Sequence, residues 1–159
     1  MFGDYVFYQK ESLISVELPA GITSIGSSSF QECSNLRHVG MPSTVKIIKY
    51  GAFSNCSSLQ DVNLSSTLTS ISTRAFSECY SLRDIILPES LEYIGDDAFQ
   101  GCSQLQQIII PNNVRNIGSY AFSSCSGLKT VILSNTLNTL GYCAFVGVII
   151  LLKSVCQPL

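Results

Sequence analysis

The chain has 159 residues, of which 46 % are hydrophobic and 13 % charged, and its formal net charge is −2. This composition is too apolar for a disordered chain, and its few basic residues are too scattered to neutralise the phosphates of a nucleic acid. The most apolar run, residues 146–152, is far shorter than the roughly 20 residues of a membrane-spanning helix. We therefore expect a single folded domain over residues 1–159, without nucleic-acid binding or membrane insertion.

A phenylalanine recurs every 23 residues, and a leucine follows six residues after each phenylalanine. A fixed period of this length is typical of a solenoid, in which coils stack along one axis and contact only their neighbours. The sequence therefore predicts a β-rich solenoid of about seven 23-residue coils. The phenylalanines are Phe7, Phe30, Phe53, Phe76, Phe99, Phe122 and Phe145, and the leucines are Leu13, Leu36, Leu59, Leu82, Leu105, Leu128 and Leu151.

The chain begins inside a repeat. Residues 1–12 match only its second half, with Val6 and Lys10 where other copies have Ala and Cys, so we expect a partial N-terminal coil. No charged start, apolar centre and cleavage site open the chain, so no signal peptide is predicted. These features fit a protein made inside the cell, a mature piece or a fragment.

Each full coil is predicted to contain two short strands, and the copy in mid-chain illustrates the first. Ile85 and Leu87 alternate with Asp84 and Ile86, as in a strand with one buried face, so the first pair is expected to point inward and the second outward. Pro88 then ends the strand, because proline has no N–H to donate to a ladder.

The second strand of this coil is predicted to lie on the opposite side and to end at Ile94, with Leu91 and Ile94 facing inward. The same two positions in the last coil, Leu137 and Leu140, are also predicted to face inward. Gly95 follows, and a tight turn with positive φ would favour glycine there. Lys49 and Ser72 fill the same column in two other coils, so positive φ is not strictly required.

The segment that carries the phenylalanine comes next. Residues 96–102 are too few for a stable free helix. They suffice for one helical or 3-10 turn that points Ala98 and Phe99 inward. We therefore predict a short helical or 3-10 turn in each coil, on the convex side of the solenoid.

Five of the seven cysteines stand three residues after a repeating phenylalanine. Neighbouring coils lie about 4.8 Å apart, which would permit bridging, but side chains in one column run parallel, which disfavours a disulfide. We interpret these cysteines as a buried ladder of free structural thiols, with disulfides as the alternative. They are Cys33, Cys56, Cys79, Cys102 and Cys125.

The last copy of the repeat departs from the others. Residues 141–159 are predicted to form an atypical C-terminal coil, in which Val148 replaces the ladder cysteine and residues 147–152 form a covering strand. A terminal coil needs a polar outer face for solubility, and neither end of this chain has an obvious one. This favours a fragment of a longer array or end-to-end association.

The pattern Leu-x-x-Ile-x-Leu-Pro-x-x-Leu-x-x-Ile-Gly-x-x-Ala-Phe-x-x-Cys, as in residues 82–102, resembles the BspA-like, or Treponema pallidum type, leucine-rich repeat. The resemblance extends from residue 3 to about residue 151. It implies a curved right-handed solenoid with strands on the concave face. It also implies frequent display on cell surfaces, with adhesion to host proteins or to other cells, so a cell-surface or secreted location is expected.

The outward positions of the stacked first strands are predicted to form one binding surface. Ile86, Ile109 and Ile132 fall in one column and make a contiguous apolar patch, which is typical of a contact surface. The alternative is that exposed isoleucine simply favours β pairing along the stack. The candidate partner-binding residues are Arg37, His38, Asp61, Arg83, Asp84, Ile86, Gln106, Ile109, Lys129 and Ile132.

The sequence indicates binding and not catalysis. His38 is the only histidine, and Cys33, five residues away, belongs to the buried ladder, so a Cys–His pair is not expected. Cysteines 23 residues apart and a single histidine do not provide a metal site, and phosphate-loop and dinucleotide motifs are absent. We expect no enzyme activity and no cofactor. The predicted function is protein interaction or adhesion on the concave strand face, and the alternative is a spacer that self-associates through its terminal coils.

Overall fold

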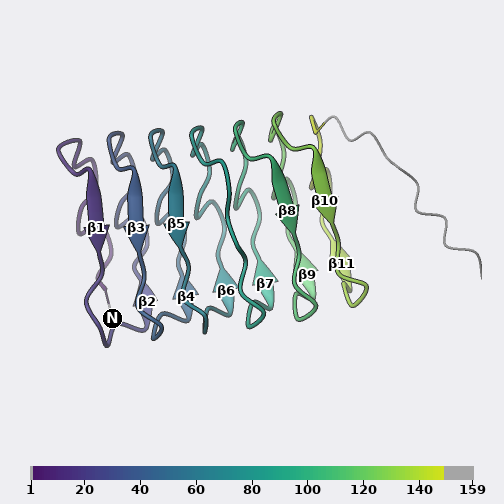
Figure 1. The fold of residues 1–159 in the computed structure, drawn as a ribbon, viewed down its shortest axis with the longest axis horizontal. Helices are drawn as coiled ribbons and strands as arrows, with labels where there is room; N and C mark the ends of the chain where they lie inside the picture. The colour runs from purple at the N-terminus through teal and green to yellow at the C-terminus, as the bar shows by residue number, and fades with distance from the viewer. Residues whose placement is uncertain (1, 149–159) are drawn as a thin grey trace, which may run out of the picture.

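The structure is a computed structural model that describes residues 2–148. Over this range the chain folds as a parallel β-solenoid in which strands of successive coils lie side by side (Figure 1). Paired residues are 23 positions apart in every strand pair, as for Ser15 and His38. This register equals the sequence repeat and confirms the predicted solenoid. Most of the predicted atypical coil at residues 141–159, including residues 149–152 of its covering strand, lies outside the described residues.

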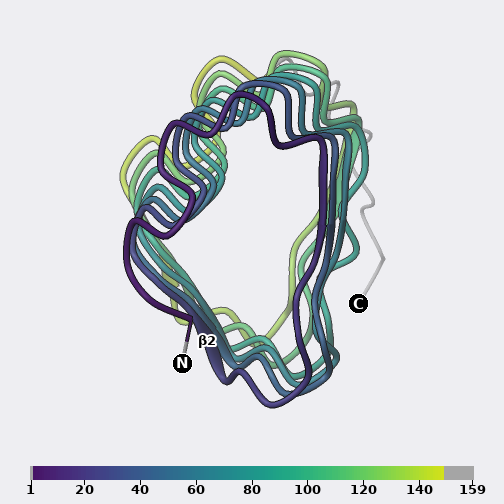
Figure 2. The ribbon, with the colours of Figure 1, turned by 90° about the vertical axis from the view of Figure 1, so that its left-hand side faces the viewer.

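The strands form two rows along the stack (Figure 1), and a view along the stack shows the coils superimposed around one interior (Figure 2). Strands of the first row have three residues, and strands of the second row have two. The first row consists of β1 (Ser15–Glu17), β3 (His38–Gly40), β5 (Asp61–Asn63), β8 (Gln107–Ile109) and β10 (Thr130–Ile132). The second row consists of β2 (Ser24–Ile25), β4 (Ile47–Ile48), β6 (Ser70–Ile71), β7 (Tyr93–Ile94), β9 (Asn116–Ile117) and β11 (Thr139–Leu140).

The first row is interrupted in the coil between β5 and β8. It forms a three-stranded sheet, β1-β3-β5, and a separate two-stranded sheet, β10-β8. The predicted alternation holds here, since Ile85 and Leu87 are buried while Ile86 is 87 % exposed. The predicted strand itself is wrong in this coil, because residues 84–87 make no backbone hydrogen bond within the described chain. Asp84 lies one repeat from Asp61, and like charges on directly opposite positions destabilise strand pairing.

The second row is continuous and forms one six-stranded sheet. Leu91 and Ile94 are fully buried, as predicted. In the last described coil, however, Leu137 is half-buried and Leu140 is 47 % exposed, so the inward prediction is wrong for Leu140. Within the described chain, β11 pairs only with β9, and packing from one side alone leaves this coil partly open.

The phenylalanines stack in the interior, one ring above the next. The ring centroids are 5.2 Å apart between Phe53 and Phe76 and 5.3 Å apart between Phe76 and Phe99, with ring planes within 8° of parallel. Offset stacking at this distance stabilises aromatic pairs beyond the burial of their surface. The fully buried rings are Phe30, Phe53, Phe76, Phe99 and Phe122.

The cysteine ladder is buried and unbridged, as predicted. Each ladder thiol donates a hydrogen bond to the backbone carbonyl of the phenylalanine one coil earlier, as Cys79 does to Phe53 at 3.2 Å and Cys102 does to Phe76 at 3.3 Å. The thiols therefore link neighbouring coils as well as filling the core. The sequence shows the ladder but not this hydrogen bond.

The predicted helical turns are wrong: the described residues contain no helix, and accordingly none long and apolar enough to cross a membrane. Asp97, with φ of 53°, and Gly101, with φ of 75°, are both left-handed and interrupt any helix. The backbone N–H of Phe99 donates to Ala121 in the next coil at 2.8 Å, whereas that of Cys102 donates back to Phe99 at 3.2 Å. A helix keeps its N–H bonds within the segment, but here β-turns share the donors with the next coil.

Gly95 has a role that differs from the predicted one. Its φ is not among the positive values, so backbone freedom is not the reason for glycine here. A Cβ at this position would lie 2.5 Å from the backbone nitrogen of Thr73 in the preceding coil. Glycine therefore allows close approach of successive coils at this corner.

Candidate functional site

The predicted binding residues lie along the first row of strands. We call the outward surface of β1, β3, β5, residues 84–86, β8 and β10, with the residue that precedes each, the strand face (Figure 1). Nine of the ten predicted residues are exposed and His38 is half-buried. Exposure makes these side chains available for contact, and their neighbours differ from one coil to the next.

One group on the strand face centres on His38. Its Nε2 lies 3.1 Å from Oε1 of Glu17, and its Nδ1 contacts Oδ1 of Asp61, so one imidazole bridges two carboxylates from the coils on either side of its own. The hydrogen bond with Asp61 raises the pKa of His38 above its usual 6.5, and Glu17 adds to the shift. A Cβ on Gly40 would overlap the Glu17 carboxylate, so glycine leaves the space in which Glu17 reaches His38.

The predicted isoleucine patch is exposed. Ile86 is 87 % exposed, Ile109 is 54 % exposed and Ile132 is 51 % exposed. Ile109 and Ile132 are register partners in the β8–β10 pair, and Ile86 and Ile109 line one cavity. The three side chains therefore form a continuous apolar strip across successive coils, of a kind that usually marks a contact surface.

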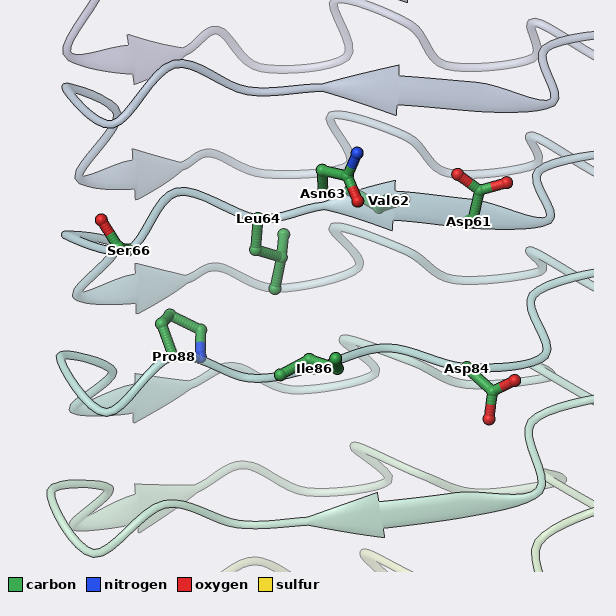
Figure 3. Close-up of a pocket in the computed structure, with 8 residues that line it drawn as sticks. All are labelled: Asp61, Val62, Asn63, Leu64, Ser66, Asp84, Ile86 and Pro88. Atoms are coloured by element: carbon green, nitrogen blue, oxygen red, sulfur yellow. The ribbon is translucent and has the colours of Figure 1, made fainter.

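Two cavities flank the interrupted segment, residues 84–87. The first, of about 460 Å³, lies between β5 and this segment, and Figure 3 shows Asp61 and Asp84 on neighbouring coils at one end of it. The second, of about 220 Å³, lies between the segment and β8. The first is lined by Asp61, Val62, Asn63, Leu64, Ser66, Asp84, Ile86 and Pro88, and the second by Ile85, Ile86, Leu87, Glu89, Gln107, Ile109 and Pro111.

The charges around the first cavity are unevenly compensated. Asp61 contacts His38, whereas Asp84 makes no ion pair or side-chain hydrogen bond among residues 2–148. The neighbouring Arg83 donates from its Nε to Oε1 of Gln104 at 3.2 Å and forms no ion pair with Asp84 in the same range. The cavity therefore presents an uncompensated carboxylate to solvent.

The thiols near this surface are not arranged for nucleophilic chemistry. Sγ of Cys33 donates to the carbonyl of Phe7 at 2.9 Å, and burial raises its pKa. Burial also raises the pKa of Cys125 to about 12. A thiol with a raised pKa is a weak nucleophile at neutral pH. Residues 2–148 contain no cluster of three or more histidine, cysteine and acidic side chains that could hold a metal ion.

The candidate binding residues did not include three residues of this surface, Glu17, Asn63 and Gln104, although the first two stand in the same outward column as Ile86. Glu17 bonds His38, Asn63 lines the first cavity and Gln104 holds Arg83. One sequence signal was available for Glu17, since the same column has Gly40 in the next coil and offers open space there. The outward direction of Asn63 also follows from its column, whereas the contact of Gln104 depends on a side-chain direction that the repeat does not reveal.

Solved structures share this fold. A leucine-rich repeat protein from Bacteroides ovatus is 37 % identical, with a TM-score of 0.79, over 84 % of this chain and 37 % of that one. The T. pallidum leucine rich repeat protein is 28 % identical, with a TM-score of 0.72, over 86 % of this chain and 77 % of that one. A leucine rich cell surface protein from Faecalibacterium prausnitzii is 38 % identical, with a TM-score of 0.71, over 82 % of this chain and 33 % of that one.

This chain thus spans little more than a third of the Bacteroides protein and about a third of the Faecalibacterium protein. Among curated proteins, no relative matches it. The family model for the BspA type leucine rich repeat region matches residues 1–106 and 92–156, in six copies. The 23-residue register, the stacked phenylalanines and this match together show that the chain belongs to the BspA-type leucine-rich repeat family.

Proposed function

We propose that this chain is a non-catalytic module that binds a protein partner through the strand face. The observation that carries the proposal is the strip of Ile86, Ile109 and Ile132, each more than half exposed on successive coils. Water-exposed apolar strips of this kind gain free energy when a partner covers them. Leucine-rich repeat proteins of this family generally serve in protein interaction and adhesion, which supports the same function.

The polar residues around the strip have a second role in this proposal. Arg37, Arg83 and Lys129 precede three of the first-row strand segments and are exposed. Charges at the rim of an interface orient the partner and speed association more than they add affinity. The isoleucines would therefore supply most of the binding energy, and the basic residues would select the orientation. His38, Asp61, Asp84 and Gln106 complete the contact surface.

We infer a cell-surface or secreted role in adhesion. The support is one relative, the Faecalibacterium protein, which is described as a leucine rich cell surface protein. A solenoid that exposes a long row of strands offers many adjacent contacts, which suits attachment to a large partner.

The test replaces all three isoleucines with serine. Peptides selected from a random phage-displayed library on the unmodified protein are measured against Ile86→Ser/Ile109→Ser/Ile132→Ser by fluorescence anisotropy. We expect affinity to fall at least tenfold while the thermal midpoint stays within a few degrees, because the side chains are exposed. Ile47→Ser, on β4 of the second row and 40 % exposed, is the matched control. Equal binding by the triple variant and the control would refute the proposed face.

A second candidate function is that of a spacer that self-associates end to end. It is favoured by β1, which pairs with a strand on one side only in the described chain and leaves an edge open to further pairing. The edge of β2 is partly covered, because the carbonyl of Ser24 accepts from the N–H of Phe2 at 3.1 Å. Sedimentation velocity at several protein concentrations separates the two functions. Growth of the sedimentation coefficient with concentration, without any ligand, supports the spacer, and a constant value supports the binding module.

A further inference from the structure

The interruption of the first row leaves backbone polar groups of residues 84–87 without partners. In neighbouring coils the corresponding groups are used: the N–H of Met41 donates to Asn63 at 3.2 Å, and that of Ile110 donates to Ile132 at 2.8 Å. The N–H of Leu87 occupies the same column and makes no such bond in the described chain. Unpaired backbone groups are strong donors and acceptors, and they face a surface that the two cavities open to solvent.

The first cavity is suited to a cation that donates several hydrogen bonds. Its charged groups are the carboxylates of Asp61 and Asp84, and the amide of Asn63 adds a further acceptor. The carboxylate of Asp84 has no partner among residues 2–148, and the carbonyls of the interrupted segment add acceptors beside it. An arginine side chain carries five N–H donors and no acceptor, so it complements this set. Its planar group can also pair with a carboxylate through two parallel bonds.

The second cavity is suited to an apolar side chain. Ile86 and Ile109 lie on its two sides, and its volume of about 220 Å³ is roughly half that of the first. The two cavities lie on opposite sides of the same segment, about one coil apart. Coils in a ladder are separated by about 4.8 Å, while residues i and i+2 of an extended chain are about 6.6 Å apart on the same side. These two steps are of similar size, so alternate side chains of one extended peptide that crosses the coils can reach both cavities.

We propose that residues 84–87 anchor an extended segment of the protein partner, with an arginine between Asp61 and Asp84 and an apolar side chain two residues away between Ile86 and Ile109. The proposal rests on the proposed function, because it specifies what the strand face recognises. Charge complementarity selects the basic residue, and the cavity beside the isoleucines selects the apolar one. The interruption is then a recognition feature and not a defect of the repeat.

The probe is the pentapeptide Thr-Arg-Thr-Ile-Thr, acetylated and amidated, titrated into ¹⁵N-labelled protein. We expect the amide signals of residues 84–87 and Ile109 to shift in a saturable way at millimolar peptide. Replacing the peptide arginine by glutamine, or the protein residue Asp84→Asn, should weaken binding about fivefold each, as for a partly exposed ion pair. Both changes together should weaken binding no more than one of them alone.

Glu92→Gln is the control, because it removes one exposed carboxylate from the second row. Unchanged affinity in Asp84→Asn, or shifts confined to other residues, would overturn the proposal. Absence of any saturable shift with this peptide would overturn it too. The proposed function would still stand if library-selected peptides lost affinity for the triple isoleucine variant, and it would fail separately if they did not.

Discussion

The two rows of strands are built from the same 23-residue repeat, yet only one of them is continuous. The second row forms a six-stranded sheet, whereas the first divides around residues 84–87. One column of the second row carries no charge and consists of Ser24, Ile47, Ser70, Tyr93, Asn116 and Thr139. The corresponding column of the first row places Asp61 beside Asp84.

This difference follows from the way a parallel in-register stack works. Residues 23 positions apart become direct neighbours across strands, so each column repeats one kind of contact along the stack. Repetition stabilises apolar columns such as the phenylalanines, because each ring packs against two similar rings. Like charges in adjacent coils are destabilised by it, because neighbouring carboxylates such as Asp61 and Asp84 repel. The core therefore tolerates little variation, while the strand face varies and carries the candidate site.

The largest effect is expected from breaking the phenylalanine stack in mid-chain. Phe76→Ala removes a fully buried ring between Phe53 and Phe99 and should lower the free energy of unfolding by about 3–5 kcal/mol. Urea denaturation followed by circular dichroism measures this loss. Ile86→Ala, at an exposed position, is the comparison and should change stability by less than about 0.5 kcal/mol. A loss below about 1 kcal/mol for Phe76→Ala would contradict a core role.

A smaller effect is expected from the cysteine ladder. Cys79→Ala removes a buried thiol and its hydrogen bond to Phe53, and it should cost about 1–2 kcal/mol. Cys143→Ala, at a half-buried cysteine outside the ladder, should cost clearly less. Chemical unfolding compares the two. Thiol titration under native conditions should also find the five ladder thiols unreactive, since burial raises their pKa. Rapid labelling of Cys79 in the folded protein would show that the ladder thiols are accessible to solvent, which would contradict their burial.

A substitution in the interrupted segment is expected to increase the free energy of unfolding. Asp84→Asn removes the repulsion with Asp61 and should stabilise the protein by about 0.2–1 kcal/mol. Hydrogen exchange measured by NMR provides a local readout. In the unmodified protein the amides of residues 84–87 should exchange much faster than that of Ile94 in β7, and Asp84→Asn should slow them. If the amides of residues 84–87 and of Ile94 exchanged equally slowly in the unmodified protein, the interruption would be contradicted.

The smallest effect is expected in the pH dependence of stability that arises from the contacts of His38 with Glu17 and Asp61. Because Asp61 and Glu17 raise the pKa of His38 in the folded state, the folded protein binds this proton more tightly than the unfolded chain does. The resulting stabilisation is fully present below the ordinary value of 6.5 and is lost as pH rises through the raised pKa. NMR titration of the imidazole should give a midpoint above 6.5, and His38→Gln should remove this part of the pH dependence. A midpoint at or below 6.5 would refute the bridged arrangement.

The solenoid, its register and its core could be predicted from the amino-acid pattern alone. The inward positions, represented by Phe76, Cys79, Leu91 and Ile94, follow directly from the 23-residue period, since stacking in register buries the same column in every coil. Side-chain direction along the first strand was also predictable, because alternation fixed Ile85 inward and Ile86 outward even where no strand formed. These are local or periodic properties, and the sequence shows them without knowledge of the contacts between particular side chains.

The positions at which strand pairing fails, and the side chains that contact one another, could be identified only in the folded molecule. The β-turns that replace the predicted helical turns depend on hydrogen bonds to the next coil. The interruption at residues 84–87 depends on what stands 23 residues before and after it. The bridge from Glu17 through His38 to Asp61 requires three coils and the space above Gly40. These features are contacts between coils, and a contact is settled by both partners at once, which is why a pattern read along a single repeat does not contain them.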